Sequence, residues 1–352
     1  MRISFISANL GAGGAERVMS LLANRFVEKG DEVEFIFLKS EICFYPINKT
    51  IKITLAEKEC NSDSMVKKLW WMRKYISRQK FDVVFAFRIS IYCATLFGLL
   101  GLKVPVIASE RIDPRYNSIP EKILQRILLP FANHLVVQTS EIKKYYPGII
   151  QKKTSVIFNP VDERVFGLQT ELKEKRIISV GRLYPQKNQK MMIDAFSRIA
   201  PDFPDWKLVI FGEGPLRETL EAQIHKLKIQ DKVLLPGRSE NVLDELNKSE
   251  LFCFSSDYEG MSNAIVEAFC IGLPIVTTKV SGTEDFIKNG ENGFLINIGK
   301  TDEMEAALRK IMSDESLRKK MAEKNRQQSD IFQLEHIFQQ WENVINKVVN
   351  QE

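Results

Sequence analysis

The chain has 352 residues, of which 44% are hydrophobic and 27% charged, with 18 Gly and 13 Pro. This length exceeds that of one typical domain, so two domains are expected, and the composition excludes a collagen, a coiled coil and an extensively disordered chain. The five cysteines are scattered, and the three histidines are too few for a His-rich metal site, so a reduced cytoplasmic protein is expected.

The charge is unevenly distributed along the chain. Residues 1–165 carry 25 Lys and Arg against 16 Asp and Glu, a net charge of +9, whereas residues 166–352 carry 25 against 29, a net charge of −4. A basic first half is typical of proteins that bind nucleic acid, an anionic membrane or a phosphorylated ligand. No apolar run reaches the roughly 18–20 residues of a membrane-spanning helix, and the first residues fit a buried strand better than a signal peptide.

Short apolar runs alternate with amphipathic segments through the whole chain. In the first half, strands are predicted at 2–8, 33–38, 83–87, 104–108 and 134–138, with a helix at 15–29. The pattern restarts with strands at 176–180, 208–211, 233–235, 251–254 and 274–277. Uninterrupted Val, Ile and Leu runs separated by helices predict an α/β protein with two doubly wound, Rossmann-like domains. We place these domains at 1–165 and 166–333, and expect a final helix at about 334–352 to pack back on the first domain.

The turn after the first predicted strand, residues 9–17, is rich in glycine. Gly13 and Gly14 would let the backbone approach a phosphate or sugar, and the dipole of the following helix favours negative charge there. The spacing is neither that of a dinucleotide-binding motif nor that of a P-loop. Gly212 lies in a similar strand–turn–helix junction at 211–215. Each signal is weak when taken alone.

Residues 64–80 predict a basic amphipathic helix. The side expected to face the sheet comprises Met65, Leu69, Met72 and Ile76. The opposite side comprises Lys67, Trp71, Lys74 and Arg78. A basic row with an aromatic residue suits an anionic leaflet or a pyrophosphate, although most such rows are solvated helix faces. The surplus of positive charge in this half favours the first interpretation.

The second half opens with a candidate diphosphate site in residues 179–188. Arg182 and Lys187 flank a turn that follows the strand at 176–180. One planar guanidinium and one mobile ammonium suit a diphosphate, whereas a pair of surface cations is the ordinary alternative. Open α/β sheets bind ligands at the carboxyl ends of their strands, and this favours the site.

Residues 255–268 carry the sharpest pattern. Glu259 precedes a helix that is predicted to begin near Ser262 or Asn263, and Glu267 lies within that helix. Backbone N–H groups at a helix N-terminus bind anions, and a carboxylate accepts hydrogen bonds from both hydroxyls of a vicinal diol. Two solvated glutamates are the alternative, but the Glu-Gly-Met-Ser-Asn turn between them favours a binding site.

Together these segments resemble the family 4 glycosyltransferases, which are retaining enzymes of the two-domain GT-B fold, over nearly the whole chain. The resemblance is carried by residues 13–17, by Asn159-Pro160-Val161-Asp162, by Gly181-Arg182-Leu183 with Lys187, by Gly212-Glu213-Gly214, and by residues 259–267. It implies two Rossmann-like domains that face each other across a cleft. It further implies that Arg182 and Lys187 hold the nucleotide diphosphate, Glu267 the ribose hydroxyls and Glu259 the transferred sugar. Backbone contacts would come from Met261, Ser262 and Asn263, with Gly13 and Gly14 across the cleft.

One position departs from the family pattern. Many members carry a histidine near the transferred sugar, after the third or fourth strand of the first domain, and Arg111 stands in that place here. An arginine cannot act as a base near neutral pH, but it can bind an anion or a sugar hydroxyl. A salt-bridged loop is the alternative interpretation of Glu110, Arg111 and Asp113.

Within the family, the chain looks most like bacterial transferases that extend polyprenyl-diphosphate-linked glycans, including those that add N-acetylgalactosamine. We therefore expect a hexosyltransferase on the inner face of the plasma membrane, which moves a hexose or N-acetylhexosamine, with retention, from a UDP-sugar to a lipid-linked saccharide. The UDP-sugar is a substrate, so no cofactor is expected. With no Asp-x-Asp in the sequence, no essential metal is expected either, and no motif indicates nucleic acid. The alternatives are a sugar-nucleotide epimerase or phosphorylase of the same fold, and a non-catalytic module that binds a UDP-sugar or a membrane.

Overall fold

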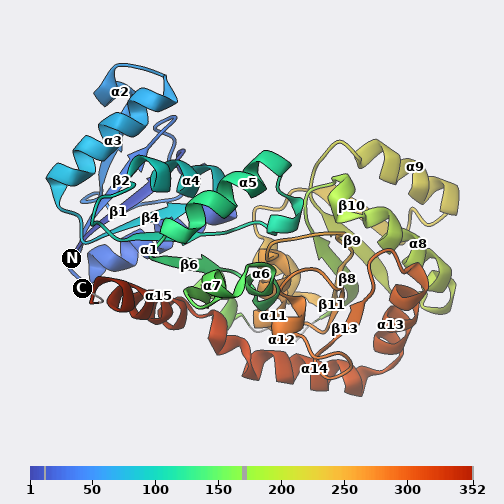
Figure 1. The fold of residues 1–352 in the computed structure, drawn as a ribbon. Helices are drawn as coiled ribbons and strands as arrows, with labels where there is room; N and C mark the ends of the chain where they lie inside the picture. The colour runs from blue at the N-terminus through green and yellow to red at the C-terminus, as the bar shows by residue number, and fades with distance from the viewer. Residues whose placement is uncertain (12, 169–172, 351–352) are drawn as a thin grey trace. The chain divides into compact units, whose positions relative to one another are not determined.

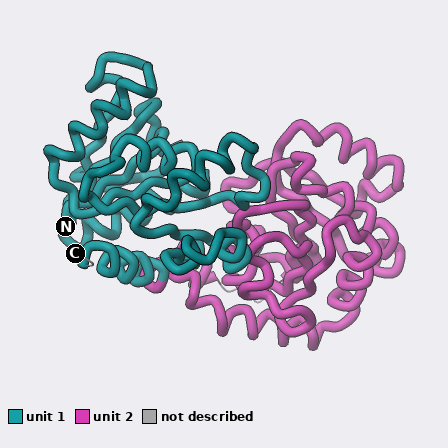
Figure 2. The backbone as a smooth tube through the Cα atoms, viewed as in Figure 1, with its two compact units in different colours: residues 1–159, 337–352 teal, residues 160–336 magenta. Residues whose placement is uncertain are grey.

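The computed structural model describes residues 1–11, 13–168 and 173–350, which form two compact units (Figures 1 and 2). Unit 1 consists of residues 1–159 and 337–352, and unit 2 of residues 160–336. The boundary lies a few residues before the expected position between 165 and 166. Ala12 of the glycine-rich turn, residues 169–172 of the expected linker and residues 351–352 of the expected final helix lie outside the described residues.

Unit 1 is built on a seven-stranded parallel sheet in the order β3-β2-β1-β4-β5-β6-β7. Its strands are β1 Arg2–Ser7, β2 Glu32–Phe37, β3 Lys52–Leu55, β4 Val83–Phe87, β5 Val106–Ser109, β6 His134–Val137 and β7 Thr154–Val156. All five residues of β4 are buried. This burial explains why the central strands read as continuous apolar runs, because both faces of the sheet are covered by helices.

Two layers of helices cover the sheet of unit 1. One layer consists of α1 Gly14–Glu28 and α15 Leu334–Val349, and the other includes α3 Met65–Gln79, α4 Ile89–Gly98 and α5 Ile119–Leu128 (Figure 1). The shorter helices are α2 Ala56–Cys60, η1 Pro114–Tyr116, η2 Leu129–Phe131, α6 Ser140–Tyr145 and α7 Gly148–Gln151. Phe26 of α1 packs against Phe338 of α15 with the rings tilted and their centroids 4.8 Å apart, and Trp341 packs against Phe85 with centroids 5.6 Å apart. The last helix thus completes the core of unit 1.

Unit 2 repeats the architecture with a six-stranded parallel sheet in the order β10-β9-β8-β11-β12-β13. Its strands are β8 Glu174–Val180, β9 Lys207–Phe211, β10 Val233–Gly237, β11 Ser249–Phe254, β12 Ile275–Thr278 and β13 Gly293–Ile296. Its helices are η3 Glu163–Gly167, η4 Pro185–Lys187, α8 Gln189–Ile199, η5 Ala200–Asp202, α9 Arg217–Leu227, α10 Val242–Asn247, α11 Asn263–Ile271, α12 Thr283–Phe286, α13 Thr301–Ser313, α14 Glu315–Gln327 and η6 Ser329–Phe332. The strand order reverses between β8 and β11, and at such a switch point an open α/β sheet leaves a crevice for a ligand.

The predicted α/β class with two doubly wound sheets is confirmed, and every predicted strand is present with its ends shifted by a few residues. Three strands were not predicted. They are β3, β7 and β13, and each lies at an edge of its sheet. β3 and β7 mix polar with apolar residues and so lack the continuous apolar runs by which central strands are found. β13 is apolar but has only four residues and begins with a glycine.

Candidate functional site

The loops after β8 and β11 lie side by side at the switch point of unit 2. The backbone N–H of Asp257 donates to the carbonyl of Gln186 at 2.9 Å, and the Gln186 side-chain amide donates to the carbonyl of Tyr258 at 2.7 Å. The amide of Asn188 donates to the Asp257 carboxylate at 2.9 Å. These bonds hold the two predicted binding segments together. Sequence analysis missed Gln186, Asn188 and Asp257, because their partners lie on a loop distant in sequence.

Lys187 and Glu259 form an ion pair between these loops. The Lys187 Nζ lies 2.5 Å from Glu259 Oε1, and the two side chains are only 14% and 11% exposed. The ammonium also lies 5.0 Å from the centroid of the Phe254 ring, and Ser255 Oγ donates to the Lys187 carbonyl at 2.8 Å. In such a weakly solvated place each charge acts strongly on a nearby ligand. The ammonium can bind a phosphate oxygen, and the carboxylate can accept from a hydroxyl.

Arg182 stands at the start of the same loop. Its guanidinium lies 4.9 Å from the ring of Tyr184, and its carbonyl accepts a hydrogen bond from Gln189 at 2.9 Å. The side chain is exposed, unlike that of Lys187. The structure therefore places the two predicted cations on one loop, with Lys187 held against the protein and Arg182 facing solvent.

Gly212 brings a third loop against this one. Its φ is +151°, and a Cβ at this position would lie 1.9 Å from the carbonyl oxygen of Gly181. A Cβ on Gly214 would lie 2.4 Å from the carbonyl oxygen of Leu183, whose N–H donates to Glu213 at 3.0 Å. These glycines are required because two backbones pack in contact here. This packing alone explains why residue 212 is a glycine. That Gly212 also contributes to binding of the donor stays a prediction.

The loop after β11 leads into α11, as predicted. Ser262 is the N-cap residue with extended backbone, and helical residues begin at Asn263. Met261 is buried, whereas Glu267, one turn into the helix, is partly exposed. Glu267 is close enough to Arg164 of η3 to help raise the pKa of that guanidinium, although Asp162 and then Asp244 contribute more. The N-terminus of α11 and Glu267 therefore lie on the element that directly follows the Lys187–Glu259 pair.

In unit 1, the chain's own carboxylate occupies the glycine-rich turn. A Cβ on Gly13 would lie 2.1 Å from Glu16 Oε2, and Glu16 is buried. The other oxygen of Glu16 lies 3.4 Å from Arg88 Nη1. A phosphate at this helix N-terminus would meet that negative charge. The sequence predicted either a phosphate or a sugar at this turn. The carboxylate of Glu16 makes the turn better suited to a sugar hydroxyl.

Arg88 is a residue of this edge that sequence analysis missed. It follows β4 and has φ +73° and ψ 144°, a conformation that is strained for any residue except glycine. Its N–H donates to the carbonyl of Ser109 at 2.9 Å, which fixes the strained residue between β4 and β5. No signal in the sequence marks this residue, because a single arginine before an apolar run is common.

Glu110 and Arg111 are both buried at the carboxyl end of β5. One oxygen of Glu110 accepts from the Tyr92 hydroxyl at 2.8 Å and the Gln125 amide at 3.0 Å, and the other from the backbone N–H of Arg111 at 3.1 Å. Burial nevertheless raises the pKa of Glu110 to about 7, since desolvation outweighs these bonds. Asp113, in contrast, pairs with Arg115, so for Asp113 the salt-bridged alternative is correct.

The Arg111 side chain points into the core of unit 1. Its Nη1 donates to Asn159 at 2.9 Å, and its guanidinium carbon lies 4.7 Å from the ring of Phe87 and 5.6 Å from that of Trp341. Burial lowers its pKa to about 9. Arg111 thus supports the sheet edge from within, and it lies apart from the exposed cations of α3 with which it was grouped as an acceptor residue.

Helix α3 forms as predicted, but its faces are rotated from the expected ones. Lys68, Met72 and Ile76 are buried, whereas Met65, expected in the core, is exposed. Trp71, expected on the outer row, is partly buried and stacks on Tyr75 with ring centroids 4.8 Å apart. The cause is Lys68, which buries its stem and places its ammonium 2.7 Å from Asp63 and 3.3 Å from Glu57.

Lys67, Lys74 and Arg78 remain exposed on α3, and the exposed aromatic residue beside them is Trp70. The Lys74 Nζ lies 5.2 Å from the Trp70 ring centroid. The outer row therefore keeps its three predicted cations, with Trp70 in place of Trp71.

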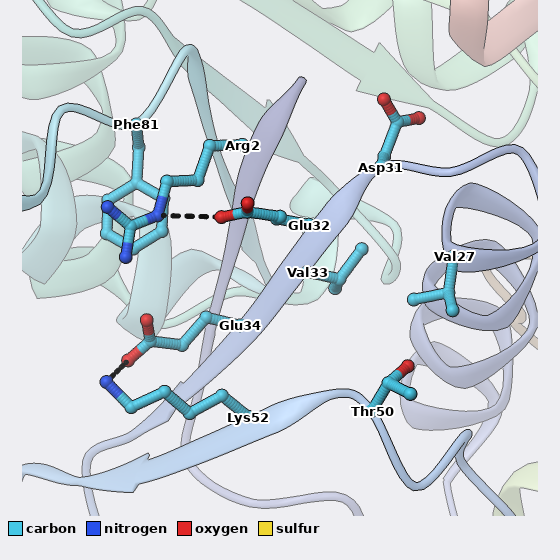
Figure 3. A pocket seen from close by; sticks show the side chains of 9 residues that line it. All are labelled: Arg2, Val27, Asp31, Glu32, Val33, Glu34, Thr50, Lys52 and Phe81. Carbon is cyan, nitrogen blue, oxygen red and sulfur yellow. Dashed lines mark ion pairs between the residues drawn. The ribbon is translucent and has the colours of Figure 1, made fainter.

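A pocket of about 280 Å³ lies at the opposite edge of the unit 1 sheet, where β1, β2 and β3 begin (Figure 3). Its charged side chains already have partners. Arg2 lies 3.6 Å from Glu32, Lys52 lies 3.3 Å from Glu34, and Asp31 accepts from the N-terminal amine at 2.6 Å. We assign no ligand to this pocket, because its charges compensate one another.

Within residues 1–11, 13–168 and 173–350, no group of three or more His, Cys, Asp or Glu side chains could hold a metal ion. No helix within the same ranges combines the length and the apolar composition needed to cross a bilayer.

Comparison with known proteins gives matches over both units. A model described as glycosyl transferases group 1 matches residues 161–328, and one described as glycosyltransferase family 4 matches residues 12–165. The GalNAc-alpha-(1->4)-GalNAc-alpha-(1->3)-diNAcBac-PP-undecaprenol alpha-1,4-N-acetyl-D-galactosaminyltransferase of Campylobacter jejuni is 31% identical over 99% of each chain. A second enzyme of the same organism, N-acetylgalactosamine-N,N'-diacetylbacillosaminyl-diphospho-undecaprenol 4-alpha-N-acetylgalactosaminyltransferase, is 29% identical and covers 92% of this chain and 93% of its own.

Solved structures share the fold over the whole chain. HepE from Anabaena, solved in complex with UDP, superposes with a TM-score of 0.82 at 17% identity, covering 99% of this chain and all of its own. The lipopolysaccharide outer core galactosyltransferase WaaB superposes with a TM-score of 0.79 at 22% identity, covering 99% of each chain. At these identities the likeness establishes the architecture.

Proposed function

Because the chain belongs to the group 1 and family 4 glycosyltransferases of GT-B fold, we propose that it transfers a hexose or N-acetylhexosamine, with retention, from a UDP-sugar to a saccharide carried on a polyprenyl diphosphate. Such a reaction would serve the assembly of a bacterial cell-surface glycan at the inner face of the plasma membrane. The names of the two C. jejuni relatives support this acceptor class, since both describe transfer to undecaprenol-linked saccharides.

The observation that carries the proposal is the Lys187–Glu259 pair at the switch point of unit 2. A UDP-sugar presents both a diphosphate and a sugar with hydroxyls, and this pair offers one group for each. Lys187 and Arg182 would bind the diphosphate, Glu259 a hydroxyl of the sugar, and Glu267 the ribose hydroxyls. Backbone N–H groups of Met261, Ser262 and Asn263 at the start of α11 would add to the binding of phosphate.

The reaction requires no group beyond these and the two substrates. The acceptor hydroxyl oxygen forms a bond with the anomeric carbon on the face from which UDP departs, while the bond from that carbon to the diphosphate oxygen breaks. The hydroxyl proton passes to the departing phosphate, and UDP and the extended saccharide are the products. Negative charge grows on the diphosphate as the bond breaks, so Lys187 and Arg182 would stabilise the transition state more than the bound substrate.

The acceptor would be held by unit 1. The three exposed cations of α3, Lys67, Lys74 and Arg78, offer binding groups for a lipid-linked diphosphate. The carboxyl edge of the sheet, with Glu16 beside Gly13, offers an acceptor for a sugar hydroxyl. Arg111 would position this edge from the core.

The test is to incubate the protein with UDP-sugars and a polyprenyl-diphosphate-linked saccharide, and to measure acceptor mass and released UDP. A mass gain of one sugar with one UDP released per sugar supports the proposal. Interconversion of the UDP-sugar without acceptor indicates an epimerase, turnover that requires inorganic phosphate indicates a phosphorylase, and binding without turnover indicates a non-catalytic module. We expect transfer to persist in EDTA, since no essential metal is proposed.

A further inference from the structure

Helix α5 presents an apolar face to solvent. Of its ten residues only Gln125 and Leu128 are buried. Ile119 is 74% and Ile127 60% exposed, and Ile123 between them and Phe131 of η2 are also exposed, so that four large apolar side chains recur every fourth residue. This spacing places the three isoleucines on one side of α5, and Phe131 follows in η2. A row of exposed isoleucines on a well-formed helix marks an interaction surface.

The helix itself is firmly built. Ser118 and Glu121 form a capping box, in which Glu121 Oε2 accepts from the Ser118 N–H at 2.9 Å and from its hydroxyl at 2.7 Å. On the inner side, the Gln125 amide donates to Glu110 and to the Tyr146 hydroxyl, at 3.0 Å each. The outer isoleucines are therefore held in place by the polar contacts of the inner side and not by packing of their own.

Neighbouring helices extend this surface. Helices α3, α4 and α5 follow one another over the same face of the sheet, with α4 in contact with both (Figure 1). Exposed apolar residues continue on them, with Val66 and Trp70 on α3 and Phe97 and Leu100 at the end of α4. Arg73 connects the two helices, since its guanidinium donates to the carbonyl of Leu100 at 2.7 Å.

The charge of this surface is positive. Helix α3 contains no acidic residue, and the single acid of α5, Glu121, is engaged in the capping box. Within the described ranges, none of the cations on these two helices that face solvent forms an ion pair with an acid. They are Lys67, Lys74, Arg78, Lys122 and Arg126. Apolar side chains among uncompensated cations suit an anionic lipid surface.

We propose that this face of α5, together with the outer residues of α3 and α4, inserts into the interface of an anionic lipid bilayer. The isoleucines and Phe131 would enter the boundary between headgroups and acyl chains, and the cations would contact the headgroups. A second copy of the chain is a poorer occupant, because two such faces would bring like charges together. The inference rests on the proposed function in one respect. Helix α5 follows the loop at the carboxyl end of β5, so docking there would hold that edge near a lipid-linked acceptor.

The test measures binding of the full chain to vesicles of phosphatidylcholine with phosphatidylglycerol, by co-sedimentation. The double variant Ile123→Ser with Ile127→Ser should lower the partition coefficient by at least about tenfold. The reason is that the variant no longer inserts these two apolar side chains into the bilayer interface. The control is Ile298→Ser in unit 2, a residue of comparable exposure that should bind as the wild type does. Raising the salt concentration should weaken vesicle binding by the wild type, because salt screens the attraction between the cations and the headgroups. A variant with Lys67, Lys74 and Arg78 changed to Gln should show a smaller salt dependence.

A soluble acceptor analogue with a short isoprenoid separates docking from catalysis. The double isoleucine variant should transfer sugar to that analogue at the wild-type rate and fail only with vesicle-bound acceptor. If the wild type fails on the soluble analogue, the proposed function falls while docking is still judged by sedimentation. Docking is overturned if the wild type does not bind anionic vesicles or if the double variant binds them equally well. It is also overturned if the wild type forms a dimer that the double variant abolishes.

Discussion

The carboxyl edges of the two sheets are built from the same kinds of residues in opposite ways. In unit 2, Lys187 and Glu259 pair directly at 2.5 Å at the mouth of the switch point, next to the exposed Arg182. In unit 1, Glu110 and Arg111 are neighbours in sequence and both buried, but they make no ion pair with one another. Glu110 accepts from Tyr92, whereas Arg111 donates to Asn159 through Nη1 alone and its Nε and Nη2 have no hydrogen-bond partner among the described residues. A ligand that binds at the Lys187–Glu259 pair can replace the partner of either charge. A ligand that displaced the partners of Glu110 or Arg111 would leave a buried polar group without a hydrogen bond, which is costly.

This difference assigns different tasks to the two edges. The edge of unit 2 supplies charges that can meet a substrate. Glu110 and Arg111 of unit 1 are enclosed by the protein. We therefore propose that the acceptor is met by Glu16, by Arg88 and by the exposed cations of α3. Variants at the edge of unit 2 should therefore lower the transfer rate. Variants in unit 1 should instead change the binding of the acceptor or the stability of the fold.

The largest effect is expected from Lys187→Ala. The ammonium meets the growing charge of the leaving diphosphate, so its loss should lower the transfer rate by about a hundredfold or more. The melting temperature should fall little, because the residue lies in a loop at the rim of the core. Rate and melting temperature are measured on the same sample. Lys190→Ala, an exposed lysine two residues beyond the loop, is the matched control and should transfer at the wild-type rate. A near-normal rate for Lys187→Ala would remove this residue from the site.

The next effect concerns the cations of α3. Changing Lys67, Lys74 and Arg78 together to Gln keeps most of each stem and removes three charges. The Michaelis constant for a polyprenyl-diphosphate-linked acceptor should rise by about tenfold, because each cation near an anionic surface contributes about 1 kcal/mol before screening by salt. The affinity for UDP should not change. If the triple variant uses the lipid-linked acceptor as well as the wild type, the row is a solvated helix face.

A smaller and two-sided effect is expected at Arg88. Its φ of +73° is strained for arginine, so Arg88→Gly should relieve strain of about 1 kcal/mol while it removes the guanidinium beside Glu16. We expect unfolding in urea to shift to the same or a higher concentration, and transfer to fall several-fold. Arg88→Ala keeps the strain and should lose both stability and activity. Full activity of the glycine variant would show that the Arg88 guanidinium takes no part in the reaction.

The smallest effect is a change in pH dependence at Glu110. Burial raises the pKa of this carboxyl to about 7 in the folded chain, above an ordinary value of about 4.3. The folded state therefore binds the proton more tightly, and the free energy of unfolding should fall as the pH rises from about 4.3 to about 7. Glu110→Gln should remove this part of the slope.

Urea unfolding at several pH values from 5 to 8 measures that slope. The control is Glu121→Gln, because hydrogen bonds from Ser118 lower the pKa of Glu121 and its stabilising effect is lost only below this range. An equal slope for Glu110→Gln and the wild type would show that Glu110 is ionised throughout.

Much of this arrangement was predictable from the sequence. Central strands were predicted correctly because buried parallel strands are continuous apolar runs. The segments around Arg182, Lys187 and Glu259 follow the carboxyl ends of β8 and β11 and lie together, while their role in binding stays a prediction. The edge strands β3 and β7 were missed because they mix polar with apolar residues, and β13 because its apolar run is only four residues long and begins with a glycine. The rotation of α3 could not be predicted, because a lysine in an amphipathic helix is expected to be exposed. Lys68 is buried only because its ammonium pairs with Asp63 and Glu57.

Contacts between loops distant in sequence were likewise beyond prediction. The contact of Glu16 with Arg88 arises because β1 and β4 are neighbours in the sheet, so that the segments after these strands meet. The inward turn of Arg111 follows from the packing of α15 over β4, which places Trp341 against its guanidinium. Local sequence patterns carry no record of such packing.

The central claim is that the switch-point edge of unit 2 binds the nucleotide of the donor. Calorimetry with UDP tests it most directly, on the wild type, on Glu267→Gln, and on Glu218→Gln, an exposed glutamate of α9, as the control. The account predicts that Glu267→Gln weakens the affinity for UDP by about tenfold through loss of a charge-assisted hydrogen bond to the ribose, while the control matches the wild type. Equal UDP affinities for the wild type and Glu267→Gln would contradict it.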